Sequence, residues 1–254
     1  MEYNVPLGGT QFAREQGDDR SPKAVVEEDV MAAGFRIALR SRSVSPDLIS
    51  AFAAVPVANV SDVMARMTAC GAPLRPLHQG GGLAGPALTV KTRPGDNLMV
   101  HKAIDLASPG DVIVVDAGGD LTNAIIGELM LAHALHRGVG GFVINGAVRD
   151  AAAIRAGHLP VYAAGITHRG PYKDGPGEIN LPIAINGMVV APGDLMLGDE
   201  DGVLCVPFDD CRIVLAAALA KQAAEVRQMA AIKAGTVDRG WVDATLARLG
   251  CEQG

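Results

Sequence analysis

Short apolar runs alternate with amphipathic segments through the middle of the chain. Three of the runs are rich in β-branched residues and have the length of strands, namely Ala87–Thr92, Val112–Asp116 and Gly141–Asn145. Continuous apolar strands of this kind are typical of a sheet that is buried on both faces. Each run is followed by a segment with a helical pattern, at Asn97–Leu106, Glu128–Arg137 and Asp150–Ala156. The alternation predicts βαβ units, and therefore an α/β fold with mainly parallel central strands.

The flanking segments predict further elements. We expect a helix over Ala24–Arg40, a second one with Ser45 as its N-cap and Pro46 as its first residue, and a third one capped by Ser61. Apolar runs then predict strands near Val161 and over Ile179–Ile185, Met188–Ala191 and Val203–Val206, and helices over Asp210–Ala234 and Trp241–Leu249. Because no repeat or linker interrupts the pattern, we expect an N-terminal arm over residues 1–22 and a single domain with C-terminal helices over residues 23–254.

Composition excludes several classes of protein. The chain has 254 residues, a formal net charge of −6 and 49% hydrophobic residues, enough to bury a sizeable core. Only 4% of residues are aromatic, so this acidic chain lacks the basic surface and the stacking rings of a nucleic-acid-binding protein. No apolar run reaches the roughly 18 residues of a membrane span. Four cysteines without a C-x-x-C pair and an N-terminus without an apolar signal segment favour free thiols and a cytoplasmic protein.

The first candidate for chemistry follows the strand that ends at Asp116. A Gly-rich loop leads from this strand to Gly127, and the helix predicted from Glu128 directs the N–H groups of its first residues, Glu128, Leu129 and Met130, outward. Free N–H donors together with the helix dipole favour an anion. Gly127 allows the backbone to approach a ligand closely. An ordinary capped helix explains the same residues without a ligand.

The second candidate follows the next strand along the chain. The segment from Asn145 to Asp150 presents Arg149 and Asp150 side by side after an apolar strand. Ligands of open parallel sheets bind outside the carboxyl ends of the strands. An arginine there can hold a carboxylate or an enolate oxygen, and an aspartate can hold a hard divalent cation. A local ion pair combined with a helix cap is the alternative.

Taken together and in order, several motifs resemble a known family. They are Asp96-Asn97, His101, Gly127-Glu128-Leu129, Gly146-Ala-Val-Arg149-Asp150, Pro192-Gly-Asp194 and Gly198-Asp-Glu-Asp-Gly202-Val, followed by Pro207. Over about residues 50 to 240, the chain is similar to the 4-hydroxy-4-methyl-2-oxoglutarate aldolases and the related regulators of ribonuclease activity. The resemblance implies a layered β/β/α, swivelling-type domain that assembles into trimers or hexamers.

The resemblance also implies an activity and roles for individual residues. The aldolases are Mg²⁺- or Mn²⁺-dependent carbon–carbon lyases that release pyruvate from 4-hydroxy-2-oxo acids, decarboxylate oxaloacetate, and work through a pyruvate enolate that the metal stabilises. By this resemblance, the backbone at Gly127–Met130 binds the substrate carboxylate and Arg149 stabilises the enolate oxygen. Asp150 binds the metal directly, and Glu128 does so through water. Glu225 reaches the site of a neighbouring subunit.

The same family includes a non-catalytic alternative. The regulators bind a ribonuclease and have a non-acidic residue at the position of Asp150, so an intact Arg149-Asp150 pair favours the enzyme. A Schiff base on Lys91 is a competing chemistry. His133 and His136 stand at i and i+3 without a third metal ligand nearby, which indicates a solvated or interface face. Asn97 and His101 can share a helix face near the cleft, and Tyr172 and Lys173 are further candidates for shaping the pocket.

Overall fold

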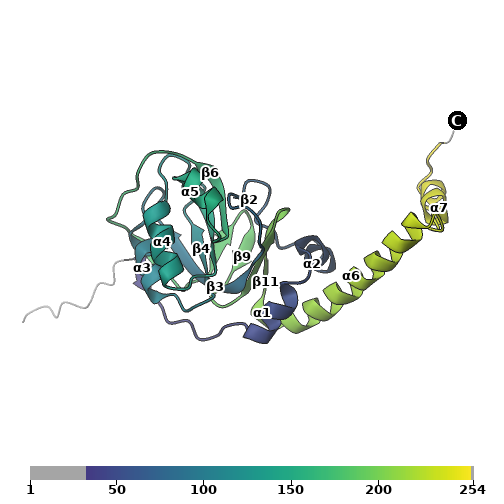
Figure 1. The fold of residues 1–254 in the computed structure, drawn as a ribbon, viewed down its shortest axis with the longest axis horizontal. Helices are drawn as coiled ribbons and strands as arrows, with labels where there is room; N and C mark the ends of the chain where they lie inside the picture. Colours follow the sequence, from purple (N-terminus) through teal and green to yellow (C-terminus); the bar gives the residue numbers. More distant parts are fainter. Residues whose placement is uncertain (1–32, 253–254) are drawn as a thin grey trace, which may run out of the picture. The chain divides into compact units, whose positions relative to one another are not determined.

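Four strands form the parallel centre of the fold, and a helix connects each of them to the next. The strands are β3 (Leu83–Thr92), β4 (Val112–Asp116), β5 (Gly141–Val148) and β6 (Val161–Ile166), and they are neighbours in this order. The connecting helices are α3 (Leu98–Leu106), α4 (Glu128–His136) and α5 (Ala151–Ala156) (Figure 1). This computed structural model describes residues 33–252, and within them the predicted βαβ units are confirmed.

The two faces of this sheet bury two different sets of side chains, because successive residues of a strand point to opposite faces. In β4, Ile113 and Val115 pack with the helices α3, α4 and α5. Val112 and Val114 belong to a second apolar cluster on the other face, which includes Tyr162 of β6. Apolar side chains on both faces explain why these strands lack a polar–apolar alternation.

The second cluster is closed by a layer of antiparallel strands. It contains the hairpins of β8 (Ile183–Ile185) with β9 (Met188–Val190), and of β10 (Leu195–Asp199) with β11 (Gly202–Val206). The long strand β3 joins the two layers, since its first residues pair with β10 and its later residues pair with β4. The fold is therefore a layered β/β/α arrangement, as predicted.

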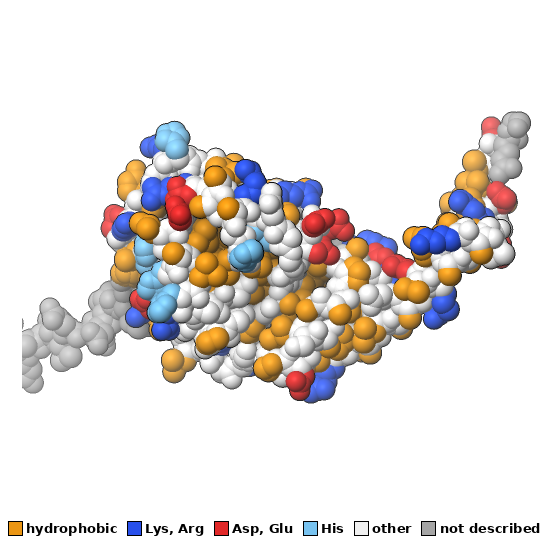
Figure 2. Space-filling view, in the orientation of Figure 1, with side chains coloured by type: hydrophobic (Ala, Val, Ile, Leu, Met, Phe, Trp, Pro, Cys, Tyr) orange, Lys and Arg blue, Asp and Glu red, His pale blue; other side chains and the backbone are white. Residues whose placement is uncertain are grey.

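Helices from both ends of the described chain cover the outer side of the second layer. They are α1 (Pro46–Phe52), α2 (Val57–Val63) and α6 (Cys211–Lys233), which share a third apolar cluster with β10 and β11. Only Cys211, Val214 and Ala218 of α6 are buried, and the helix α7 (Gly240–Arg248) buries none of its residues. Hydrophobic side chains accordingly remain at the surface along α6 (Figure 2).

Several boundaries differ from the sequence prediction. We predicted a helix over Ala24–Arg40, of which residues 24–32 lie outside the described residues. The prediction is wrong for the later part, because residues 35–37 form the strand β1 (Phe35–Ile37) alongside β7 (Gly177–Ile179). Ser61 is not an N-cap but lies inside α2, which begins after Pro56. The strand predicted over Ile179–Ile185 is divided into β7 and β8 at Asn180, whose φ is 59°.

Other predictions in the same region are confirmed or extended. Ser45 and Pro46 begin α1 as predicted. The pairing of β10 with β3 was not predicted, and neither was the short β2 (Arg75–Pro76) beside β6. All four cysteines are free thiols. Between residues 33 and 252, no helix has both the length and the hydrophobicity that a lipid bilayer requires.

Candidate active site

The two candidate loops meet because the segment that precedes α4 runs beside the end of β5. Ile125 N donates to the carbonyl of Ala147 at 2.8 Å, and Arg149 N donates to the carbonyl of Ile126 at 3.0 Å. These backbone bonds bring Gly127 against the side chains of Arg149 and Asp150. The structure therefore places both predicted transitions at one edge of the sheet, where the carboxyl ends of β4 and β5 lie.

The first turn of α4 has fewer free N–H donors than the sequence predicts. Glu128 N donates to Asp150 Oδ2 at 2.9 Å, and Met130 N donates to the carbonyl of Gly127 at 3.1 Å. Of the predicted donors Gly127–Met130, the N–H groups of Gly127 and Leu129 have no acceptor among the described residues. These two donors and the positive end of the helix dipole remain for an anion.

Asp150 has an unusual backbone conformation, with φ 58° and ψ 41° in the left-handed region. It precedes α5, but its carboxylate makes no capping bond to that helix and instead accepts from the first residue of α4. Its Oδ2 lies 3.7 Å from Arg149 Nε, and both side chains are about 40% exposed (42% for Arg149 and 41% for Asp150). The pair is thus neither a cap of its own helix nor a buried ion pair, and both groups are accessible to a ligand.

A pocket of about 90 Å³ lies beside this pair, between α3, α4 and the loop of residues 169–175. Its lining includes Gly127, Leu129, Met130 and Arg149, together with Asn97, His101, Pro171 and Lys173. A second hollow of about 170 Å³ adjoins it and shares His101, Leu129 and Met130. Histidine side chains gather over α3 and α4 on this face of the molecule (Figure 2).

Asn97, which immediately precedes α3, and His101 of α3 contribute polar groups to the pocket. The side chain of Asn97 is almost completely buried and its Nδ2 donates to the carbonyl of Ile125 at 2.8 Å, while its Oδ1 has no partner among residues 33–252. His101 has a pKa below its ordinary value because of burial and, next, because of the positive charge of Lys173. The imidazole is therefore neutral near pH 7. The sequence indicated Asn97, His101 and Lys173 only as candidates.

Oxygen donors at the rim of the pocket fit a hard divalent cation. Mg²⁺ is usually held by one or two carboxylates together with water and substrate oxygens, so a complete protein cage is not required. Asp150 offers a half-exposed carboxylate, and Glu128, whose backbone N–H donates to that carboxylate, has an exposed side chain. No group of three or more His, Cys, Asp or Glu side chains in the described chain is arranged to hold a metal on its own.

Within a single chain, Glu225 lies apart from Asp150 and Glu128. Its carboxylate lies 2.6 Å from Asn59 Nδ2 and 2.9 Å from Lys221 Nζ, on the surface where α6 packs against α2. The hydrogen bond from Lys221, followed by the one from Asn59, lowers the pKa of Glu225. The predicted role of Glu225 in a neighbouring site stays a prediction.

The remaining candidates lie outside the pocket. Lys91 is exposed on β3 and faces Asp116 and Glu178 on the neighbouring strands. His133 lines the adjoining hollow and lies 3.5 Å from Asp105. Sequence reasoning missed the role of Asp96, which is fully buried and binds the 169–175 loop. In the sequence, the Pro94-Gly95 turn directly before Asp96 was the available signal that this aspartate belongs to a structured loop.

Comparisons with known proteins agree with this architecture. The family profile "RraA-like: Aldolase/RraA" matches residues 57–205. A protein of Halalkalibacterium halodurans named "Putative 4-hydroxy-4-methyl-2-oxoglutarate aldolase" is 43% identical over 177 residues, which cover 70% of this chain and 84% of that protein. A protein of Thermus thermophilus named "4-hydroxy-4-methyl-2-oxoglutarate aldolase" is 37% identical over 112 residues, or 44% of this chain and 68% of that protein.

A solved structure shows the same fold. The RNA-processing inhibitor RraA from Thermus thermophilus superimposes with a TM-score of 0.56 and 31% identity, and the match covers 60% of this chain and 92% of that one. The family profile spans more than half of the chain, and it includes β3 to β6 and the loops that carry Gly127, Arg149 and Asp150. The chain therefore belongs to the RraA-like family of aldolases and RraA proteins.

Proposed function

We propose that this protein is a divalent-metal-dependent aldolase that cleaves 4-hydroxy-2-oxo acids to pyruvate and a second oxo acid, and that also decarboxylates oxaloacetate. The names of its relatives support an aldolase. The observation that carries the proposal is the position of Arg149 and Asp150. Both are half exposed and lie directly against Gly127 at the start of α4, beside a pocket of a size suited to a small acid.

The chain's own residues would bind the substrate through its carboxylate. The free N–H groups of Gly127 and Leu129 and the dipole of α4 offer positive potential to that anion. Arg149 lines the same pocket and supplies a planar, permanently charged donor for the neighbouring carbonyl oxygen. Cleavage of the carbon–carbon bond builds negative charge on this oxygen, so a donor that is already in place lowers the barrier.

Asp150 would hold Mg²⁺ or Mn²⁺ directly, and Glu128 would do so through water. When bound, the cation supplies Lewis-acid stabilisation of negative charge on the substrate oxygens. The Asp150 carboxylate accepts from Glu128 N, which holds it at the start of α4. Asp150 is thus suited to bind a cation whose other ligands are water and substrate oxygens.

The C4 hydroxyl of an aldol substrate must lose its proton. Two groups are candidates to accept it. The neutral imidazole of His101, whose pKa is lowered, lines the pocket, and the exposed carboxylate of Glu128 stands at the start of α4 beside a separate hollow that α5 lines. Oxaloacetate has no such hydroxyl. A variant that lacks only the proton acceptor should therefore lose aldol cleavage and keep decarboxylation, whereas loss of a metal contact should lower both activities. Measuring both activities in Glu128→Gln and in His101→Gln assigns the two roles.

We also propose assembly into a trimer or a hexamer. Hydrophobic side chains on α6 are exposed in the single chain, including Leu219, Val226, Met229 and Ile232. Glu225 belongs to the same helix, so an interface there would place it near another subunit. Sedimentation of the purified protein measures the state directly, and a monomer at micromolar concentration would contradict this part of the proposal.

The solved RraA structure supports a second candidate, an oligomeric regulator that binds a ribonuclease. The two candidates differ at Asp150, which an aldolase requires and a regulator does not. Pyruvate release is measured over a panel of 4-hydroxy-2-oxo acids and oxaloacetate, with Mg²⁺, with Mn²⁺ and with a chelator. We expect turnover with metal and none with chelator. Absence of turnover on every substrate would favour the regulator.

Two variants complete this experiment. Asp150→Asn removes the proposed ligand and should abolish metal-dependent pyruvate release without unfolding the protein, since the side chain is half exposed. Asp209→Asn is a matched control, because it removes a charge of the same sign from an exposed aspartate–arginine pair on η1 (Phe208–Asp210), outside the pocket lining. Full activity of Asp150→Asn, or equal losses in both variants, would contradict the assignment.

A further inference from the structure

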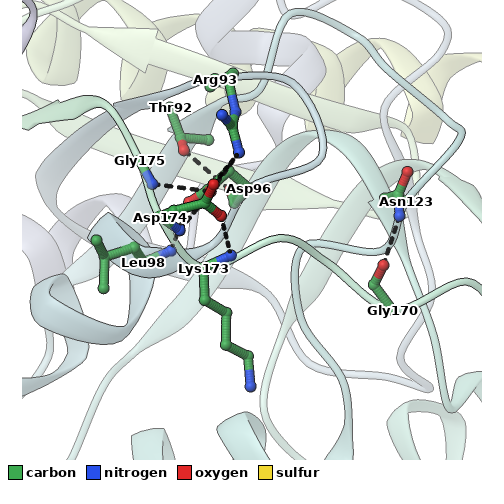
Figure 3. A network of polar contacts seen from close by, with 9 residues as sticks. All are labelled: Thr92, Arg93, Asp96, Leu98, Asn123, Gly170, Lys173, Asp174 and Gly175. Atoms are coloured by element: carbon green, nitrogen blue, oxygen red, sulfur yellow. Dashed lines mark hydrogen bonds and ion pairs between the residues drawn. The ribbon is translucent and has the colours of Figure 1, made fainter.

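One carboxylate beside the pocket is fully buried and accepts four hydrogen bonds. Asp96 Oδ1 accepts from Leu98 N at 2.9 Å, at the start of α3. Its Oδ2 accepts from Arg93 Nη2 at 3.0 Å and from the backbone N–H groups of Asp174 and Gly175, each at 2.9 Å (Figure 3). A buried charge is tolerated only when it is paired and hydrogen-bonded. Asp96 meets this condition by joining α3 to the 169–175 loop.

Further bonds hold the same loop along its length. Tyr172 exchanges backbone bonds with residues on both sides of Asp96, donating to the carbonyl of Gly95 at 2.9 Å and accepting from Asn97 N at 3.0 Å. At the other end of the loop, Asn123 Nδ2 donates to the carbonyl of Gly170 (Figure 3). The loop is thus held in place over the pocket, where Pro171 and Lys173 form part of the lining.

The chemistry of the anchor requires an aspartate. Both carboxylate oxygens accept hydrogen bonds and neither donates. The two oxygens of Asp96 face donors from two different elements, α3 and the loop. An asparagine of the same size cannot replace it, because its NH₂ group would face one of these sets of N–H donors and its uncharged oxygen would accept more weakly from the other.

We propose that Asp96 is a positioning residue whose carboxylate fixes the 169–175 loop against the start of α3 and thereby holds Pro171 and Lys173 as one wall of the pocket. Asp96 does not line the pocket and acts only through the loop. The arrangement of the wall is independent of the reaction, and only the kinetic part of the test rests on the proposed function.

Hydrogen exchange in Asp96→Asn tests the anchor directly. The amides of Asp174 and Gly175 should exchange roughly tenfold faster or more, as expected for the loss of a charge-assisted hydrogen bond. Asp111→Asn is the matched control, because Asp111 is also buried, pairs with Arg40 at 2.7 Å and precedes β4 at the opposite edge of the sheet. Unchanged exchange in Asp96→Asn, or the same acceleration in Asp111→Asn, would overturn the proposal.

The titration of His101 reports the position of Lys173 without any turnover. Burial lowers the pKa of His101, Lys173 and His133 lower it further, and Asp105 on the same helix raises it. The pKa of His101, measured by NMR, should therefore rise in Asp96→Asn and in Lys173→Met, and should stay unchanged in Asp111→Asn. A pKa in Asp96→Asn equal to that of the wild type would show that Lys173 has not moved, which contradicts the proposal.

Kinetics then separate this proposal from the proposed function. If the protein is an aldolase, Asp96→Asn should raise KM for the oxo acid more than it lowers kcat, whereas Asp111→Asn should leave both unchanged. A wild-type protein without turnover would refute the function, but hydrogen exchange and the titration would still decide the role of Asp96. If Asp96→Asn does not fold, the wild type decides: amides of Asp174 and Gly175 that exchange at the rate of unprotected loop amides would overturn the anchor.

Discussion

Gly127→Ala adds a single methyl group at the point where the two candidate loops meet. The backbone of Gly127, with φ −151°, is extended and accepts any residue, so the substitution introduces no backbone strain. A Cβ at this position would lie 2.5 Å from Asp150 Oδ2, 2.9 Å from Arg149 Cγ and 3.0 Å from Arg149 Nε. The three atoms nearest to the methyl group therefore all belong to the two side chains that the proposed reaction uses.

The size of the effect follows from these distances. Asp150 Oδ2 must retreat by about 0.9 Å to restore an ordinary contact of 3.4 Å. A misplacement of about 1 Å can cost roughly 10²-fold in rate, or about 2.7 kcal/mol in the activation free energy. Both side chains are about 40% exposed and can rotate toward solvent, so we expect the free energy of unfolding to fall by no more than about 1 kcal/mol.

The assay is metal-dependent pyruvate release, measured together with urea unfolding. Gly240→Ala is the matched control, because Gly240 also begins a helix and its added Cβ would lie 3.3 Å from an aspartate oxygen, that of Asp238. We expect kcat/KM to fall about 10²-fold in Gly127→Ala and to stay unchanged in Gly240→Ala. Full activity in Gly127→Ala would refute the idea that Arg149 and Asp150 act in their present positions.

Three further predictions concern single side chains. Arg149→Met should lower kcat by about 10²–10³-fold while the protein stays folded, and a loss below tenfold in the pyruvate assay would contradict its role. Arg40→Met should lower the free energy of unfolding by roughly 3 kcal/mol, because it leaves the buried Asp111 without its arginine partner. Arg66→Met, in the exposed pair with Asp62, should cost less than about 1 kcal/mol, and equal urea midpoints would contradict this. Because the pKa of His101 is lower in the folded than in the unfolded state, its contribution to stability is complete above about pH 6.5 and is lost as the pH falls. His101→Gln should therefore reduce the loss of stability between pH 8 and 5.5, and an unchanged loss in urea titrations would refute the shift.

Much of the fold follows from local pattern. The runs around Val114 and Val143 predict the central strands, because side chains on both faces of a parallel sheet are apolar. The same pattern predicts the helices between them and the start of α1 at Pro46. Arg149 and Asp150 could be chosen for the same reason, since residues that follow parallel strands stand at the edge where ligands bind.

Other features depend on contacts between distant parts of the chain. Residues 35–37 form a strand only because β7 offers them a partner, and β10 depends on the first half of β3 in the same way. Local sequence also cannot show that the Asp150 carboxylate turns to α4 instead of capping its own helix. That choice depends on the absence of a side chain at Gly127, 23 residues earlier in the chain.

The sequence by itself determined the fold class, the order of the central elements and the edge of the sheet that carries the candidate chemistry. Only the tertiary structure decided which N–H groups of α4 remain free, and that Asp96 binds the 169–175 loop over the pocket. The reason is physical. Periodicity records which face of an element is buried, whereas hydrogen bonds between loops depend on backbone positions that are set by the packing of the whole domain.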